Sequence, residues 1–307
     1  MFFEEHAKLL SDFARVSQAA GARADYVQGG GGNTSVKLPG GLMAIKASGF
    51  CLSDIRPDKA YAVLDGADLR NFYLTTEPCA LADVEKEGSA RAKADIRHID
   101  GLADLRPSVE AGFHSILKTF VVHTHSVYAN LAACSTACQQ IAAQAFSGAA
   151  YTWGWVPYTD PGANLTFAIR DELRRVEKET GKLPSVILMQ NHGIIVHDDD
   201  PDTTLAIHTN ANERLAHMFG LTGTSFPKVT VREMAAGIYA AHTPYLAEQL
   251  RSGDYTQEFL MTQPLYPDQM VFLTDTFYLD QSSLSAGQAI ASVKTGEMLM
   301  LMDEKKA

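Results

Sequence analysis

The 307-residue sequence has few of the features that mark secreted, membrane-spanning or nucleic-acid-binding proteins. Its four cysteines are too few for a disulfide scaffold, and we read them as the reduced thiols of a reducing compartment. No run of about 18 apolar residues is available to span a bilayer. The first residues, Met1–His6, lack the basic and apolar regions of a secretory signal. These absences predict a cytoplasmic protein without a membrane partner.

Positive charge is also scarce. Lys+Arg number 26 and Asp+Glu number 36, which gives a net charge of -10. That sign opposes general binding to a nucleic-acid backbone, so we expect no nucleic-acid partner. A small phosphorylated metabolite is still compatible, because backbone amides and a few local donors can bind one phosphate group. With 46% hydrophobic residues and only moderate glycine (23) and proline (12), the chain is expected to form a packed globular protein.

Helical and strand-like patterns alternate along the first two thirds of the chain. This interleaving predicts a layered α/β architecture around one sheet. Residues 61–105 mix strand-like pieces with charged sequence, and we interpret them as a surface insertion. After about residue 220 the pattern is less regular, with a helix expected near 231–241 and a strand near 269–273. The other predicted helices cover residues 4–20, 129–144, 163–180 and 201–219, and the predicted strands cover 42–45, 121–125, 185–189 and 194–196.

Two histidines lie at the end of a predicted strand. His123 and His125 are two residues apart, and side chains with that spacing lie on the same face of a strand, so the pair could bind one metal ion. His192 follows another buried strand, and Gly193 beside it suits a tight turn. Three protein ligands with one open position are typical of a catalytic zinc or similar ion. The alternative for His192 is a hydrogen bond within its own turn.

A carboxylate precedes the histidine pair in the sequence. Pro107 opens a predicted helix with Ser108 as its N-cap, and Glu110 lies in the first turn. Because this helix leads directly into the histidine strand, Glu110 is the natural candidate for an acid/base. Its alternative role is a surface glutamate favoured by the helix dipole. His114 lies one turn later and either supports the site through a hydrogen bond or simply faces the core.

Two turns could bind a phosphate group. Gly29–Ser35 exposes consecutive backbone amides, and Asn33 and Ser35 add side-chain hydrogen bonds. Lys46–Gly49 forms a second anion-binding turn after the next strand. Neither segment is a P-loop or a dinucleotide-binding fingerprint. A merely flexible turn is the alternative for the glycine run.

These segments together resemble the class II aldolase/adducin-head family, which includes fuculose- and rhamnulose-phosphate aldolases. The resemblance implies a three-layer α/β/α fold around one central, largely antiparallel or mixed sheet. It implies a catalytic domain over residues 1–220, with an insertion at about 60–105, and a C-terminal extension over 221–307. The long format resembles the aldolase part of bifunctional aldolase/dehydrogenases. The resemblance rests on Gly32-Asn33-Thr34-Ser35, Lys46-Ala47-Ser48-Gly49, Pro107-Ser108-Val109-Glu110, His123-Thr124-His125, Val156-Pro157-Tyr158, Pro161-Gly162 and Asn191-His192-Gly193.

The resemblance also implies an activity and the residues that perform it. The activity is that of a zinc-dependent aldolase, a lyase that cleaves or forms a carbon-carbon bond in a phosphorylated ketose or related sugar through a metal-stabilised enediolate. Glu110 would be the acid/base of this reaction. The family forms tetramers, so we expect a homo-oligomer. By the same motifs, the resemblance implies that the ligands of Zn2+ or another divalent ion are His123, His125 and His192. It implies that the residues that bind the substrate phosphate are Asn33, Ser48, Gly49 and Ser108.

Other functions on the same scaffold are open. A sugar-phosphate 4-epimerase, a dehydratase or a decarboxylase would use a similar site, although epimerase-like members tend to have Asp where this chain has Glu110. An adducin-like, non-catalytic interaction module is an alternative of another class. The three intact histidines argue against it. A proton-donating tyrosine is not fixed by the sequence; the candidates are Tyr158, Tyr239 and Tyr266.

Overall fold

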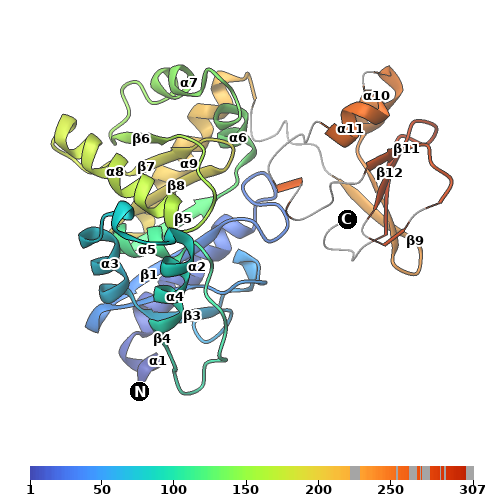
Figure 1. Ribbon diagram of the computed structural model, residues 1–307. Coiled ribbons are helices and arrows are strands. Elements are labelled where there is room, and N and C mark those ends of the chain that lie inside the picture. The colour runs from blue at the N-terminus through green and yellow to red at the C-terminus, as the bar shows by residue number, and fades with distance from the viewer. Residues whose placement is uncertain are drawn as a thin grey trace. The chain divides into compact units, whose positions relative to one another are not determined.

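The computed structural model describes residues 1–221, 229–253, 255–262, 268–269, 271, 277–283, 285–286 and 288–301. The chain divides into two compact units, Met1–Leu221 and Thr222–Ala307 (Figure 1). Each unit has its own sheet and its own hydrophobic core, and we describe them separately. None of the described helices is both long and apolar enough to cross a membrane.

An eight-stranded sheet forms the centre of the first unit. Its strand order is β4-β3-β2-β1-β5-β8-β7-β6, and within the described residues every pair of neighbours is antiparallel except β6 and β7. Its strands are β1 (Asn33–Leu38), β2 (Leu42–Lys46), β3 (Tyr61–Asp65), β4 (Ile96–Arg97), β5 (Phe120–Thr124), β6 (Trp153–Val156), β7 (Val186–Met189) and β8 (Gly193–Asp198).

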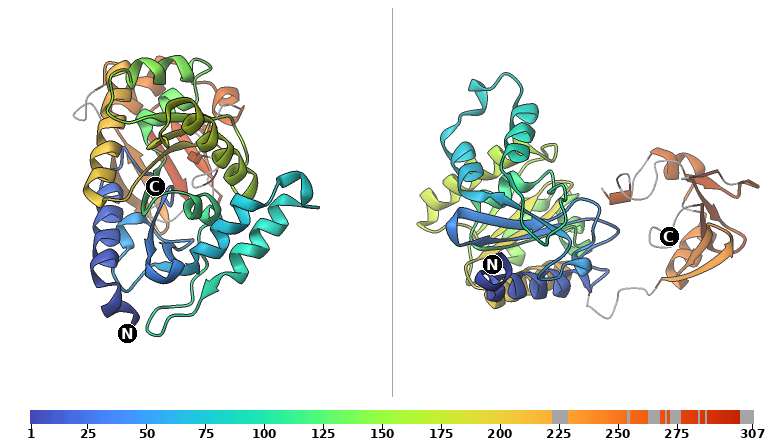
Figure 2. Two further views of the ribbon diagram at one scale, coloured as in Figure 1. Left: turned by 90° about the vertical axis from the view of Figure 1, so that its left-hand side faces the viewer. Right: turned by 90° about the horizontal axis from the view of Figure 1, so that it is seen from below.

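Helices cover both faces of this sheet (Figure 2). One face packs against α3, α5 and α8, and the other against α2, α6, α7 and α9. The predicted three-layer α/β/α fold with a largely antiparallel sheet is therefore confirmed. The helices of this unit are α1 (Phe2–Glu5), α2 (Ala7–Gly21), α3 (Gly66–Thr75), α4 (Val84–Ala94), α5 (Ala111–Ile116), α6 (Val127–Ala133), α7 (Cys138–Ala145), α8 (Ala163–Thr180) and α9 (Pro201–Met218).

Strand β5 lies in the middle of the sheet and is buried on both faces. Val121 packs into the cluster under α3, α5 and α8, whereas Phe120 and Val122 pack toward α2 on the opposite face. Burial on both faces explains why this strand appears in the sequence as a continuous apolar run. Because side chains alternate along a strand, His123 projects to the same side as Val121, toward α5.

The expectation that residues 61–105 form a surface insertion is wrong for their first part. Tyr61–Asp65 is strand β3, which pairs with β2 over its whole length, and Ala62, Val63 and Leu64 are almost completely buried. Leu69 of α3 also belongs to the main core. The charged residues around α4 obscured this arrangement in the sequence.

Two predicted helices have different bounds in the structure. The helix expected at residues 129–144 is divided into α6 and α7, because the hydroxyl of Ser135 accepts a hydrogen bond from the Ala137 backbone and forms a turn between them. The helix expected to be capped by Ser108 starts later, with Glu110 at the N-cap position of α5. Glu110 therefore precedes the first turn of this helix.

The second unit contains a five-stranded sheet of order β11-β12-β13-β10-β9. The helix predicted near residues 231–241 is wrong: β9 and β10 form a hairpin there, and Gly237 takes the left-handed conformation (φ 73°) between them. Of the strand expected at 269–273, residues 269 and 271 lie in π-helical turns and the others are outside the described residues. The elements of the second unit are β9 (Thr230–Ala235), β10 (Ile238–His242), α10 (Pro244–Ser252), α11 (Gln257–Thr262), β11 (Phe277–Leu279), β12 (Ala289–Ser292) and β13 (Glu297–Leu301).

Arg170 provides a stability test for the packing of α8 against α3. Its guanidinium is 2% exposed and donates to the carbonyl oxygens of Tyr73 (3.0 Å) and Thr76 (2.7 Å). Arg170→Met removes the donors from two backbone acceptors, so we expect a loss of about 2–4 kcal/mol of unfolding free energy in urea titrations. The control is Arg174→Met, whose half-exposed guanidinium donates to Leu74 and should cost less than about 1 kcal/mol. Equal losses would contradict this role of Arg170.

Candidate metal centre

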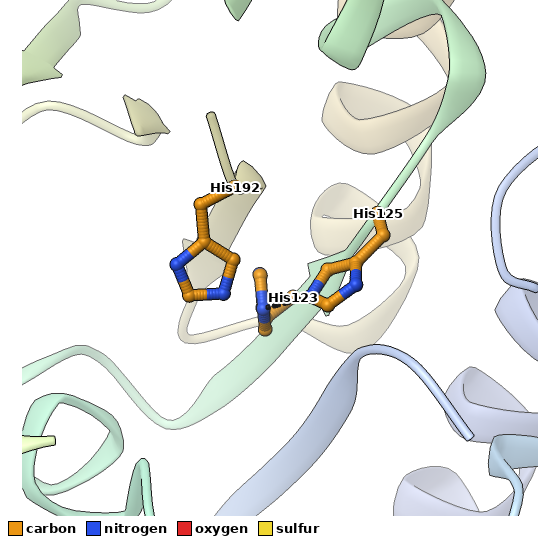
Figure 3. A group of neighbouring side chains, drawn as sticks. All are labelled: His123, His125 and His192. Carbon is orange, nitrogen blue, oxygen red and sulfur yellow. Dashed lines mark hydrogen bonds between the residues drawn. The ribbon is translucent and has the colours of Figure 1, made fainter. Parts of the chain in front are cut away.

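His123 and His125 extend from the end of β5 toward a common point (Figure 3). His123 is the penultimate residue of the strand and is fully buried, whereas His125 follows the strand directly and is partly buried. Their Nε2 atoms are 3.0 Å apart. The Nδ1 atom of His123 lies 3.0 Å from the carbonyl oxygen of Ile194, which fixes the ring with Nε2 toward His125. The predicted pair therefore shares one face, as its spacing indicates.

His192 approaches the pair from the turn between β7 and β8. Asn191 in this turn has a left-handed backbone (φ 52°), and the backbone N–H of His192 donates to Met189. The ring of His192 is 4.9 Å from that of His123 and 5.1 Å from that of His125, measured between centroids. The turn thus places the third histidine beside the other two.

Glycine at two positions allows β5 to approach its neighbours. A Cβ atom on Gly193 would overlap the carbonyl oxygen of Thr124, and a Cβ on Gly32 would lie 2.6 Å from that of His123. Both approaches are too close for a real side chain, so any larger residue would force the backbones apart. The histidine cluster therefore depends on close backbone packing on both sides of the end of β5.

The three histidines fit a single metal ion. One ligand nitrogen from each residue can be chosen so that all lie within 4.8 Å of one another. In a tetrahedral zinc site, bonds of about 2.0–2.1 Å place ligand nitrogens about 3.3 Å apart, which is within this range. Burial lowers the pKa of His123 to about 3 despite the nearby Glu110, so its imidazole is neutral. A neutral imidazole is the form that binds a metal.

Glu110 lies against this cluster. Its carboxylate oxygens are 3.1 Å from Nε2 of His192 and 3.7 Å from Nε2 of His123, and the residue is 6% exposed. Burial alone would raise the pKa of Glu110, but His123 and the hydrogen bond from His192 hold that pKa well below its usual range. The site therefore presents an ionised carboxylate beside three imidazoles.

Asn33 and His114 hold Glu110 in place. The Asn33 amide donates to Glu110 and, at 3.0 Å, to the hydroxyl of Ser108. The amide oxygen of Asn33 is hydrogen-bonded to Nε2 of His114, and Nδ1 of His114 is 2.8 Å from the hydroxyl of Ser35. His114 is fully buried, and its two ring nitrogens are hydrogen-bonded to Ser35 and Asn33, so it does more than face the core.

The predicted phosphate-binding residues lie in two segments joined by a β-bridge. Ala47 pairs with Pro107 in antiparallel fashion, so Ser48 lies opposite Arg106, and Ser108 on the other side of Pro107 is hydrogen-bonded to Asn33. Gly49 has a left-handed backbone (φ 88°) with open space where a side chain would be. One further residue, not indicated by the sequence motifs, lies beside this turn.

The missed residue is Arg106. Its exposed guanidinium donates to the hydroxyl of Ser48 at 3.3 Å, and its carbonyl accepts from the Ser48 backbone. It adds a positive charge to a turn that otherwise offers hydroxyls and amides. Its position directly before Pro107-Ser108 was the only sequence signal that could have indicated it.

Of the three candidate tyrosines, Tyr158 is the one that the structure describes within the first unit. Tyr158 is 56% exposed, its hydroxyl donates to Asp160 at 2.9 Å, and its backbone N–H donates to Gln190. Tyr239 belongs to β10 of the second unit. Tyr266 lies outside the described residues.

Comparison with known families agrees with this architecture. The family model described as Class II Aldolase and Adducin N-terminal domain matches residues 11–219. The chain belongs to this family. Among curated proteins, no sequence matches the chain.

Solved structures also resemble this class II aldolase family member. The N-terminal class II aldolase domain of a conserved protein from Thermoplasma acidophilum is 20% identical, with a TM-score of 0.56 over 68% of this chain and 92% of that domain. L-fuculose-1-phosphate aldolase from Thermus thermophilus is 15% identical, with a TM-score of 0.42 over 70% of this chain and 95% of that enzyme. YgbL from Klebsiella pneumoniae, described as a candidate aldolase/epimerase/decarboxylase, is 17% identical, with a TM-score of 0.48 over 72% of this chain and 93% of YgbL. At 20% identity, the similarity to the Thermoplasma domain shows the shared fold.

Gly193→Ala tests whether close packing positions the histidines. The added methyl group would meet the Thr124 carbonyl, so we expect β8 to shift and metal binding to weaken about tenfold or more, measured by competition with a chromogenic chelator. The control is Gly148→Ala, at a left-handed glycine (φ 68°) with nothing within 4 Å. That change should cost about 1 kcal/mol of stability but leave metal affinity unchanged. Similar metal affinity in both variants would show that the packing is not required.

Proposed function

We propose that the protein is a zinc-dependent aldolase that cleaves or forms a carbon-carbon bond in a phosphorylated ketose or related sugar. The main support is one arrangement: three histidine side chains within ligand distance of one another, with the Glu110 carboxylate beside them. His123, His125 and His192 would hold the ion and leave a coordination position for substrate. Family membership supports the same reaction class.

A bound divalent ion would act as a Lewis acid that polarises a substrate carbonyl. Glu110 would remove the proton from the adjacent carbon and return it in the reverse direction. The geometry suits this role, because the carboxylate is ionised, nearly buried and shielded from bulk water. Asn33 and His114 restrict its movement, which keeps the accepting oxygen directed at the reacting carbon.

The phosphate end of the substrate would bind at Ser48, Gly49 and Ser108, on the two segments joined by the bridge between Ala47 and Pro107. Arg106 would supply a charged hydrogen bond there, and backbone amides near Gly49 would supply the others. Asn33 links this turn to Glu110, because its amide already donates to both Ser108 and Glu110. Binding of phosphate would therefore help to orient the acid/base.

We further propose a cytoplasmic homo-oligomer, on family membership. Light scattering should give a mass that is a multiple of 33.3 kDa. A mass near that of a single chain would contradict the proposed oligomer.

Metal content and Glu110→Gln test the proposed chemistry together. Elemental analysis should find about one zinc ion per chain, and His123→Ala should lose it. Glu110→Gln should retain the metal but lower kcat by about 100- to 10,000-fold, because the amide cannot accept the proton. The control is Glu179→Gln on the exposed side of α8, which should leave kcat unchanged. Full activity of Glu110→Gln would exclude this residue as the base.

A product assay identifies the reaction. Incubation with a panel of ketose 1-phosphates and added Zn2+ should release dihydroxyacetone phosphate and an aldehyde. An isomeric sugar phosphate would instead indicate an epimerase, loss of water a dehydratase, and carbon dioxide from a sugar-acid phosphate a decarboxylase. Bound zinc without turnover of any substrate would favour the adducin-like interaction module.

Arg106→Gln tests the phosphate end separately. Loss of one charged hydrogen bond should raise KM for a phosphorylated substrate by about tenfold or more, with a smaller effect on kcat. The control is Arg97→Gln, at a comparably exposed arginine that pairs with Asp65 on the edge of the sheet. An unchanged KM for Arg106→Gln would place the phosphate elsewhere.

A further inference from the structure

A second cavity lies at the other end of β1. Its volume is about 320 Å³, which falls in the range of small-molecule sites. Lys37 contributes to its lining and is four residues from Asn33, a separation of about 13 Å along a strand. The cavity is bounded by α3, by the end of α5 and by residues 117–119, which precede β5, and α3 and α5 pack into the same core cluster on one face of the sheet. It is therefore separate from the histidine cluster.

Two cationic side chains in this cavity lack a carboxylate partner. Lys37 donates to the carbonyl oxygen of His114, and Arg70 donates to that of Ser115 at 3.3 Å. Neither forms an ion pair with a carboxylate of the described residues. Lys118, a third cation, pairs with Asp198 at 2.9 Å. The two cations therefore retain hydrogen-bonding capacity for a ligand.

The carboxylate that lines the cavity is already engaged. Asp199 accepts hydrogen bonds from the backbone N–H and the hydroxyl of Thr119, at 3.1 and 2.7 Å. Burial and the neighbouring Arg70 hold the pKa of Lys37 well below its usual value, although Asp199 opposes this effect. Burial disfavours the charged ammonium of Lys37 and Arg70 repels it, so an anion placed between the two side chains would stabilise the protonated form of Lys37.

The rest of the lining is mainly apolar. Leu117 and Leu173 contribute side chains from α5 and α8, and Leu42 contributes from β2. A ligand that fills this volume would combine a charged oxygen group with a hydrocarbon or aromatic body. Inorganic phosphate alone would leave the apolar part of the cavity unfilled.

We propose that this cavity binds a small organic oxyanion, a carboxylate or a phosphate monoester, with its charged end between Lys37 and Arg70. The site lies at the C-terminal end of α5, and Glu110 lies at the N-terminal end of the same six-residue helix. A ligand that draws Lys37 away from the His114 carbonyl would act on the residue that holds Asn33. An effect of this ligand on catalysis would rest on the proposed function, whereas binding of the ligand in the cavity does not.

Calorimetric titration of the full chain tests the binding. The probes are phenyl phosphate and benzoate, which share an aromatic body and differ in the anionic group. The probe that binds more tightly identifies the anionic group that the cavity prefers. Arg70→Gln should weaken binding of that probe by about tenfold or more, because a charged hydrogen bond is lost. Ala67→Phe, at an exposed residue of α3 that lines the cavity, should weaken it similarly by filling the space while leaving the charges intact.

Two controls separate this cavity from other sites. Arg56→Gln removes an exposed guanidinium that donates to the Ser53 and Ile55 carbonyls outside the cavity, and it should leave binding unchanged. Ser48→Ala alters the proposed substrate-phosphate turn and should also leave binding unchanged, so failure of the proposed function would not affect this result. The proposal is overturned if neither probe binds, if Arg70→Gln and Ala67→Phe bind normally, or if Ser48→Ala abolishes binding. Equal affinity for inorganic phosphate would overturn the organic part of the proposal.

Discussion

The close packing of β5 between its two neighbours is the constraint on which the candidate site depends. Gly32 and Gly193 leave no room for a side chain beside the carbonyl oxygens of His123 and Thr124, so three backbone segments meet at van der Waals distance. This contact brings the turn that holds His192 beside the end of β5, although the two segments are distant in sequence. The apolar residues of β5 are buried on both faces, which anchors the strand in the centre of the sheet. The rigidity of the core is thus transmitted directly to the histidines.

Much of the first unit could be predicted from the sequence because its signals are local. Apolar runs in β5, β7 and β8 indicated buried strands, and helical spacing indicated α2, α8 and α9. The histidine pair could be placed on one face from its spacing alone. His192 and Glu110 could be named as candidates from their positions in the sequence. Their distances from the pair could not be predicted, because the proximity of β8 to a strand about 70 residues earlier is a property of the sheet order. No periodic pattern in a single sequence states that β8 pairs with β5.

The remaining features arise from contacts that local patterns do not record. The strand-like pattern of β3 was visible in the sequence, but its place in the main sheet was not. Charged helical sequence follows it, and hydrophobic spacing cannot show which strand it pairs with. The hairpin of β9 and β10 was predicted as a helix, although Gly237 provides a turn between two segments that pair as antiparallel strands. The link from Asn33 to His114 joins β1 to α5 across 81 residues. Arg106 gained significance only when the bridge between Ala47 and Pro107 placed it beside Ser48.

The brevity of α5 has a consequence for how this family member can vary. Glu110 precedes the helix, His114 lies one turn along it, and the residues after Ile116 border the second cavity. Insertion of one residue into this helix would rotate everything beyond it by about 100°, which would turn the imidazole away from Ser35 and Asn33. A change in the length of α5 would therefore misalign both ends at once. All six helix residues are also buried, and a Cβ atom on Gly112 would lie 2.5 Å from the hydroxyl oxygen of Thr166, so the segment is constrained in composition as well as in length.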